Sequence, residues 1–135
     1  RQIEFMLGNR NENMMKPHQH DPETYALLQA ELDQPSLYDI VLGLLNDAIP
    51  EHSDAIQKWK QVYENPEKHW TLYQLAEKLV DLEDYLRRWR FNHVTTVERI
   101  IGLKTGTGGT NGVGYLRKML DVVIFPDLWQ VRTVL

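Results

Sequence analysis

Cysteine is absent from this 135-residue chain, and its absence excludes several classes of protein. Without cysteine there is no disulfide framework, no thiolate nucleophile and no cysteine-ligated zinc or iron–sulfur site. Serine is almost as rare, since Ser36 and Ser53 are the only two. Neither begins a Ser-x-x-Lys motif, so the Lys-Thr-Gly sequence at 104–106 does not indicate a β-lactamase.

Long apolar runs and an excess of positive charge are also lacking. No unbroken apolar stretch reaches the length of about 18 residues that a transmembrane helix needs, and the first residues lack the order of a signal peptide. We therefore expect a cytoplasmic protein with no membrane partner. The formal net charge of -4 argues against a nucleic-acid partner, because phosphate binding requires a basic surface.

Helix signals run along the chain, and no segment alternates convincingly with the period of a strand. Residues 1–65 contain three start signals: Asp21 ahead of a first-turn proline, Ser36 followed three residues later by Asp39, and Ser53. The sequence therefore predicts an all-α fold that begins with short helices.

Residues 66–101 predict one very long helix, because no glycine or further proline interrupts them. Apolar residues recur there at intervals of three and four, at Leu72, Leu75, Ala76, Leu79, Leu82, Leu86, Trp89, Val97 and Ile101. At about 1.5 Å per residue the helix is about 50 Å long, too long for a small domain to cover alone. We expect its face from Leu72 to Val97 to be exposed unless a partner covers it.

Residues 102–114 hold six of the eight glycines, and residues 115–135 predict terminal helices, with a helical segment over 115–125 and a restart at Pro126. The glycine-rich segment is neither a P-loop nor a dinucleotide-binding turn. So many glycines indicate close approach to a ligand more than a simple connector, and the backbone N–H groups suit a carboxylate or propionate.

His93 lies on the apolar side of the long helix, four residues after Trp89 and four before Val97. We expect it to point inward. Periodicity alone favours a hydrogen-bonded core histidine, while an axial haem ligand is the alternative.

Two of the arginines near His93 are explained by ion pairs within the helix. Arg87 and Arg88 each follow an acid by four residues, which predicts surface ion pairs. Arg90 has no such acid, and we expect its guanidinium to reach a propionate.

Five stretches together form a specific pattern. They are Lys-His-Trp-Thr-Leu-Tyr-Gln-Leu-Ala-Glu-Lys at 68–78, Trp-Arg-Phe-Asn-His-Val at 89–94, Val-Glu-Arg-Ile-Ile-Gly at 97–102, Gly-Thr-Gly-Gly-Thr at 106–110 and Phe-Pro-Asp-Leu-Trp at 125–129. In them the chain resembles the carboxy-terminal half of a bacterial tryptophan 2,3-dioxygenase. The resemblance implies an all-helical homotetramer that binds haem b and uses dioxygen to convert L-tryptophan to N-formylkynurenine.

The resemblance also implies roles for individual residues. His93 matches the proximal histidine that ligates the haem iron, and Trp89 matches the tryptophan packed beside it. Gly106 is assigned to cofactor binding and Thr107 to the ammonium and carboxylate end of the substrate. No catalytic residue is expected in this half, because the distal histidine, the carboxylate-binding arginine and the aromatics around the indole belong to the amino-terminal half. We expect that half as a covalent or separate partner.

Two other functions fit the same residues. One is a haem-binding module without turnover, and the other is a helical fragment whose exposed apolar helix drives association.

Overall fold

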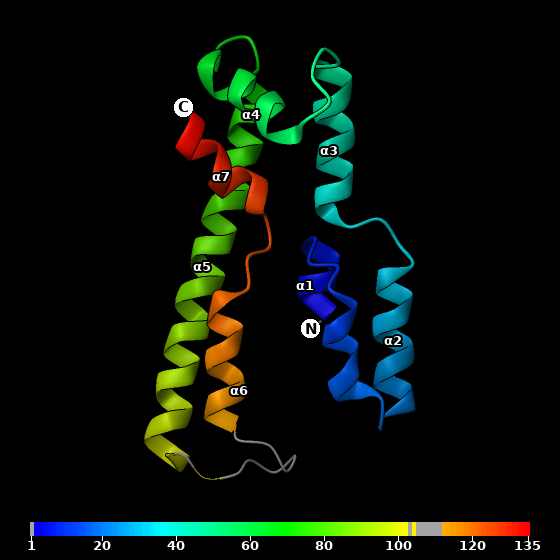
Figure 1. The fold of residues 1–135 in the computed structure, drawn as a ribbon, viewed down its shortest axis with the longest axis vertical. Coiled ribbons are helices and arrows are strands. Elements are labelled where there is room, and N and C mark those ends of the chain that lie inside the picture. Colours follow the sequence, from blue (N-terminus) through cyan, green and yellow to red (C-terminus); the bar gives the residue numbers. More distant parts are fainter. Residues whose placement is uncertain (1, 103, 105–111) are drawn as a thin grey trace. The chain divides into compact units, whose positions relative to one another are not determined.

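The computed structural model describes residues 2–102, 104 and 112–135, and within them every regular element is a helix (Figure 1). The predicted all-α fold is confirmed. The helices are α1 (Gln2–Leu7), the 3-10 helix η1 (Glu12–His18), α2 (Pro22–Leu32), α3 (Leu37–Ala48), α4 (Ala55–Glu64), α5 (Trp70–Ile101), α6 (Gly112–Lys118), the 3-10 helix η2 (Met119–Asp121) and α7 (Pro126–Val134). None of the described helices is both long and apolar enough to span a membrane.

The chain forms two compact units, and the long helix α5 runs through both. The first unit comprises residues Arg1–Glu77 with Ile124–Leu135, and the second comprises Lys78–Val123. Within the first unit, α4 packs against α7 and α3, while α1 packs against α2 and α3.

Two of the three predicted helix starts are confirmed. The Asp21 carboxylate accepts a hydrogen bond from the Thr24 amide at 3.3 Å. Ser36 and Asp39 form a reciprocal capping box, with side-chain to backbone distances of 3.1 and 2.9 Å. The third start was wrong by one residue, because Asp54 rather than Ser53 accepts the amide of Ile56, at 3.0 Å. Aspartate and serine are about equally good at this position, so the sequence alone does not separate them.

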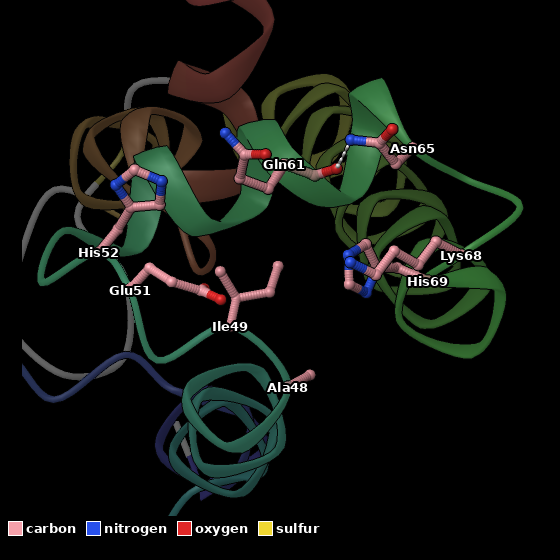
Figure 2. A pocket seen from close by; sticks show the side chains of 8 residues that line it. All are labelled: Ala48, Ile49, Glu51, His52, Gln61, Asn65, Lys68 and His69. Carbon is pink, nitrogen blue, oxygen red and sulfur yellow. Dashed lines mark hydrogen bonds between the residues drawn. The ribbon is translucent and has the colours of Figure 1, made fainter.

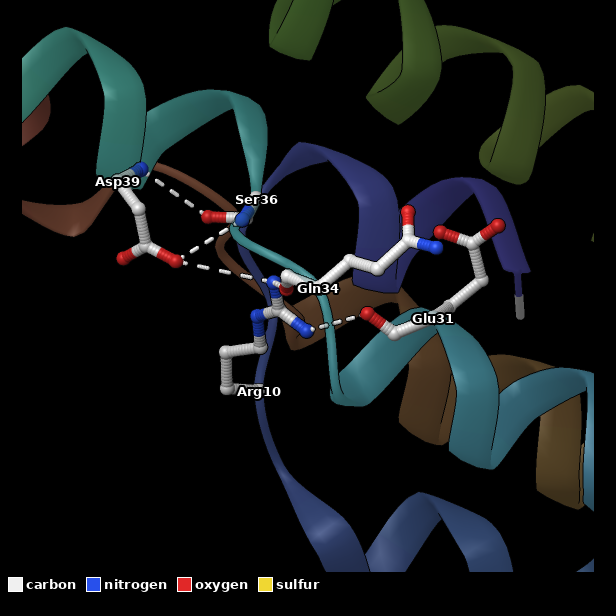
Figure 3. Close-up of polar contacts among 5 residues, drawn as sticks. All are labelled: Arg10, Glu31, Gln34, Ser36 and Asp39. Carbon is white, nitrogen blue, oxygen red and sulfur yellow. Dashed lines mark hydrogen bonds and ion pairs between the residues drawn. The ribbon is translucent and has the colours of Figure 1, made fainter.

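Arg10 holds the connection between α2 and α3 through hydrogen bonds and an ion pair (Figure 3). Its guanidinium donates to the carbonyl of Glu31 at 2.9 Å and to the carbonyl of Gln34. It also lies 3.7 Å from the carboxylate of Asp39. The same arginine therefore satisfies carbonyls at the end of α2 and pairs with the acid that caps α3.

Tyr38 joins three helices of the first unit. Its hydroxyl accepts from the indole N–H of Trp59 at 3.1 Å and donates to the carboxylate of Asp127 at 2.7 Å. Burial raises the pKa of Tyr38, and the bond to Asp127 raises it further. Tyr38 therefore stays protonated and links α3, α4 and α7. Gly8 packs so closely that an added Cβ would meet the Tyr38 Cβ at 3.0 Å, and its positive φ of 151° also favours glycine.

The core of the first unit surrounds this link. Its apolar side chains with no exposed surface are Phe5, Leu45, Trp59, Val62, Ala76, Phe125, Leu128 and Val131. At the edge, Arg132 donates to the Tyr63 hydroxyl at 3.2 Å and to Glu77 at 3.1 Å. Burial alone would raise the pKa of Glu77, but its hydrogen bonds to Tyr63 and Arg132 outweigh burial and lower it. These contacts attach the beginning of α5 to α4 and α7.

The second unit contains the rest of α5, followed by α6 and η2. The predicted helix over 66–101 is observed from Trp70 to Ile101, and Gly102 ends it with a φ of 60°. The predicted helix over 115–125 was wrong in its last part, because regular helix ends at Asp121. The next residues leave the helical path, and Ile124 and Phe125 are buried in non-helical backbone.

Replacing Tyr38 by phenylalanine should lower the free energy of unfolding by about 2 kcal/mol, because the Trp59 N–H and the Asp127 carboxylate each lose a hydrogen-bond partner. Urea denaturation followed by circular dichroism measures the change. The matched control is Tyr25→Phe, since no described residue hydrogen-bonds to the Tyr25 hydroxyl. Equal stability of the two variants would contradict the proposed role of Tyr38.

Candidate functional site

An apolar stripe on α5 lies open to solvent. Leu82, Tyr85, Trp89, His93 and Ile100 follow one another at intervals of three, four or seven residues, so they share one side of the helix. Tyr85 is 72% exposed, Trp89 57% and Ile100 75%. Contiguous exposed apolar surface of this kind marks interaction and ligand-binding sites. We call these five residues the exposed stripe.

His93 lies within the exposed stripe, so the prediction that it points inward was wrong. Its imidazole stacks on the indole of Trp89, with ring centroids 5.0 Å apart and planes inclined by 7°. No described residue hydrogen-bonds to either imidazole nitrogen. The stacking limits rotation of the ring, while its nitrogens remain accessible.

The predicted exposure of the face from Leu72 to Val97 was correct only in part. Leu72, Ala76, Leu79 and Val94 are buried, with exposed fractions of 8% or less. The apolar residues of α5 are spread over two neighbouring stripes, of which one is buried and one is exposed. The periodicity of apolar residues alone does not separate the buried stripe from the exposed one.

The arginines beside the stripe are held by protein groups. Arg88 pairs with Asp84 at 2.7 Å on the surface, as the spacing predicted. Arg87 pairs with Glu83 at 3.8 Å, but the Glu83 side chain is fully buried, so the prediction of a surface pair was wrong there. Arg90 is only 7% exposed and donates to the carbonyl of Val122 at 3.2 Å. The expectation that Arg90 reaches a propionate is therefore wrong, because its guanidinium attaches α5 to the segment after η2.

Gly106 and Thr107 lie outside the described residues, so their predicted roles stay predictions. The described residues that flank them in the chain are Lys104 on one side and Gly112, where α6 begins, on the other. An ion pair of 2.7 Å between Glu98 of α5 and Arg117 of α6 joins the two helices that flank this segment.

The exposed stripe fits a flat, apolar cofactor with a metal at its centre. A haem iron takes four ligands from its own ring, so one accessible imidazole completes the protein's share on that side. His93 offers that nitrogen, and the aromatic residues around it offer a surface on which a macrocycle can lie. Tyr85 was not predicted, although its position four residues before Trp89 was a sufficient signal.

Comparisons with known proteins all point to one family. The family model described as tryptophan 2,3-dioxygenase matches residues 53–135. The tryptophan 2,3-dioxygenases of Bradyrhizobium diazoefficiens and Ruegeria pomeroyi are each 58% identical to this chain, over 100% and 98% of its length. That of Paraburkholderia phytofirmans is 55% identical over 100% of it. The matches cover 54%, 53% and 49% of the three relatives, so the chain spans about half the length of the curated relatives it matches.

Replacing Arg90 by alanine should lower the free energy of unfolding by about 2 kcal/mol, because the carbonyl of Val122 loses its donor and a buried side chain is removed. The control Arg88→Ala should cost less than about 0.5 kcal/mol, since that ion pair is exposed. Chemical denaturation of both variants tests the difference. A larger loss at Arg88 would show that Arg90 is not a structural link.

Proposed function

Because the chain belongs to the tryptophan 2,3-dioxygenase family, we propose that the exposed stripe of α5 is the haem-binding face of such an enzyme, with His93 as the axial ligand of the iron. The observation that carries the proposal is the position of His93 on an open apolar face, with no hydrogen bond to a described residue. A core histidine would be buried and hydrogen-bonded, which makes that alternative the weaker one.

Each residue of the stripe has a physical task in this proposal. The imidazole of His93 would hold the iron through a ring nitrogen. Trp89 holds the imidazole plane by stacking at 5.0 Å and excludes water from one side of the ring. Tyr85 and Leu82 would offer apolar contacts to the cofactor. When bound, haem supplies the ferrous iron at which dioxygen reacts with L-tryptophan to give N-formylkynurenine.

The substrate side of the proposal rests on the family resemblance. We assign Gly106 to the cofactor and Thr107 to the ammonium and carboxylate groups of L-tryptophan. The groups expected to face the indole belong to the part of the relatives that this chain does not cover. The active unit is proposed to be a homotetramer in which that part completes each site.

Titration of the 135-residue chain with ferric haem tests the ligand assignment. The chain should bind haem with a shifted Soret band, and His93→Ala should weaken binding at least tenfold because the axial nitrogen is lost. Adding imidazole should restore the band in this variant by supplying a ligand in place of the side chain.

The matched control is His20→Ala, which removes an exposed histidine from a different segment. It should leave the titration unchanged. If His93→Ala titrates like the unaltered chain, His93 is not the ligand. A normal titration with no N-formylkynurenine formed in the presence of the complementary half would instead favour a haem-binding module without turnover.

A further inference from the structure

Two charged side chains flank the exposed stripe of α5, one near each of its ends. Asp81 lies eight residues before Trp89, and Arg99 lies ten residues after it. Because Asp81 and Arg99 are about five helical turns apart, they lie on the same edge of the helix. Both residues are exposed, and no described residue forms an ion pair or a hydrogen bond with either side chain. This edge of α5 therefore carries a negative charge at one end and a positive charge at the other.

This distribution of charge is complementary to itself when two copies of α5 run antiparallel. With Trp89 near the twofold axis of such a pair, Asp81 of each copy lies opposite Arg99 of the other. In a parallel pair each charge would lie opposite the same charge, and the two copies would repel each other. The charges therefore favour one partner in one direction, a second copy of this chain with its α5 reversed.

The residues between the two charges fit the same register. Trp89 lies against its own counterpart, and Tyr85 lies opposite His93. Leu82 lies opposite Thr96. Tyr85 and Trp89 are 72% and 57% exposed, so pairing removes two large aromatic side chains of each copy from water.

We propose that, in the absence of haem, the exposed stripe binds a second copy of this chain, with the two α5 helices antiparallel and Asp81 of each copy paired with Arg99 of the other. Pairing covers the imidazole of His93, so the dimer and a haem complex exclude each other. This exclusion rests on the proposed function, whereas the pairing itself rests on the residues of α5 alone.

Charge reversal tests the pairing, with sedimentation velocity of the haem-free 135-residue chain as the measurement. The unaltered chain should show a reversible equilibrium between monomer and dimer. Asp81→Arg and Arg99→Asp should each weaken the dimer at least tenfold, because each change places like charges opposite one another twice. Combining the two changes in one chain should restore the dimer, since the exchanged charges attract again.

The matched control is Glu51→Arg, which makes the same change of charge in the first unit. Glu51 is exposed and lines, with Lys68 and others, a pocket of about 280 Å³ near the connection of α3 to α4 (Figure 2). This variant should pair like the unaltered chain. The proposal would be overturned by the absence of a dimer, by equal effects of Glu51→Arg and Asp81→Arg, or by a double variant that stays monomeric.

The absence of cysteine allows a direct test of the direction of the helices. A short bismaleimide reagent should crosslink Asp81→Cys chains to Arg99→Cys chains, because antiparallel pairing brings these two positions together. Asp81→Cys chains alone should give no crosslinked dimer, since their two cysteines lie about 27 Å apart along the pair. Efficient crosslinking of Asp81→Cys chains to one another would show a parallel pair and overturn the proposal.

Addition of ferric haem distinguishes this proposal from the proposed function. The dimer should dissociate as the Soret band shifts. A dimer that persists with a shifted Soret band would overturn the mutual exclusion. A Soret band that does not shift would contradict only the assignment of His93 as a haem ligand, because the charge-reversal and crosslinking results do not depend on haem.

Discussion

The division of the apolar surface of α5 is the constraint from which the functional argument follows. This helix has 32 residues, and its apolar side chains occupy two neighbouring stripes. One stripe, which includes Ala76 and Leu79, is buried. The other carries Trp89 and His93 and is exposed. Burial of this stripe would release about 25 cal/mol for each Å² of apolar surface covered. A cofactor or a partner that covers this stripe gains that energy, and in the proposed function His93 would add a metal–ligand bond.

The first unit anchors the beginning of α5. Tyr38 ties α3, α4 and α7 together through Trp59 and Asp127. Arg132 then links Tyr63 of α4 to Glu77 of α5. The start of the long helix is thus held by a polar network that surrounds an apolar core, and the exposed stripe begins only after this anchored portion. The contacts that anchor α5 and the exposed stripe therefore lie in successive parts of the same helix.

Much of this fold could be predicted from the sequence because the signals are local. The capping box of Ser36 and Asp39, the proline that begins α7 and the glycine that ends α5 each follow from residues close together in the chain. The helical pattern over 115–125 failed because Ile124 and Phe125 are buried through tertiary packing in non-helical backbone, which no periodicity records. The cap of α4 is Asp54 and not the predicted Ser53, because the two neighbouring side chains are about equally suited to this position.

The site was predictable to a smaller extent. The family resemblance placed Trp89 beside His93, and their rings do stack. The spacing of apolar residues did not tell which of two adjacent stripes is buried, because burial depends on which other segments cover the helix. Arg90 illustrates the same limit, since its partner Val122 lies 32 residues away in the chain. The pocket between Glu51 and Lys68 joins segments whose proximity only the fold reveals.

The coordination of His93 to iron is the central claim, and resonance Raman spectroscopy of the reduced haem complex tests it most directly. The account predicts an iron–histidine stretching band that shifts when histidine is labelled with 15N and disappears in His93→Ala. A band that persists in this variant, or a complex whose unaltered form shows no histidine-sensitive band, would contradict it.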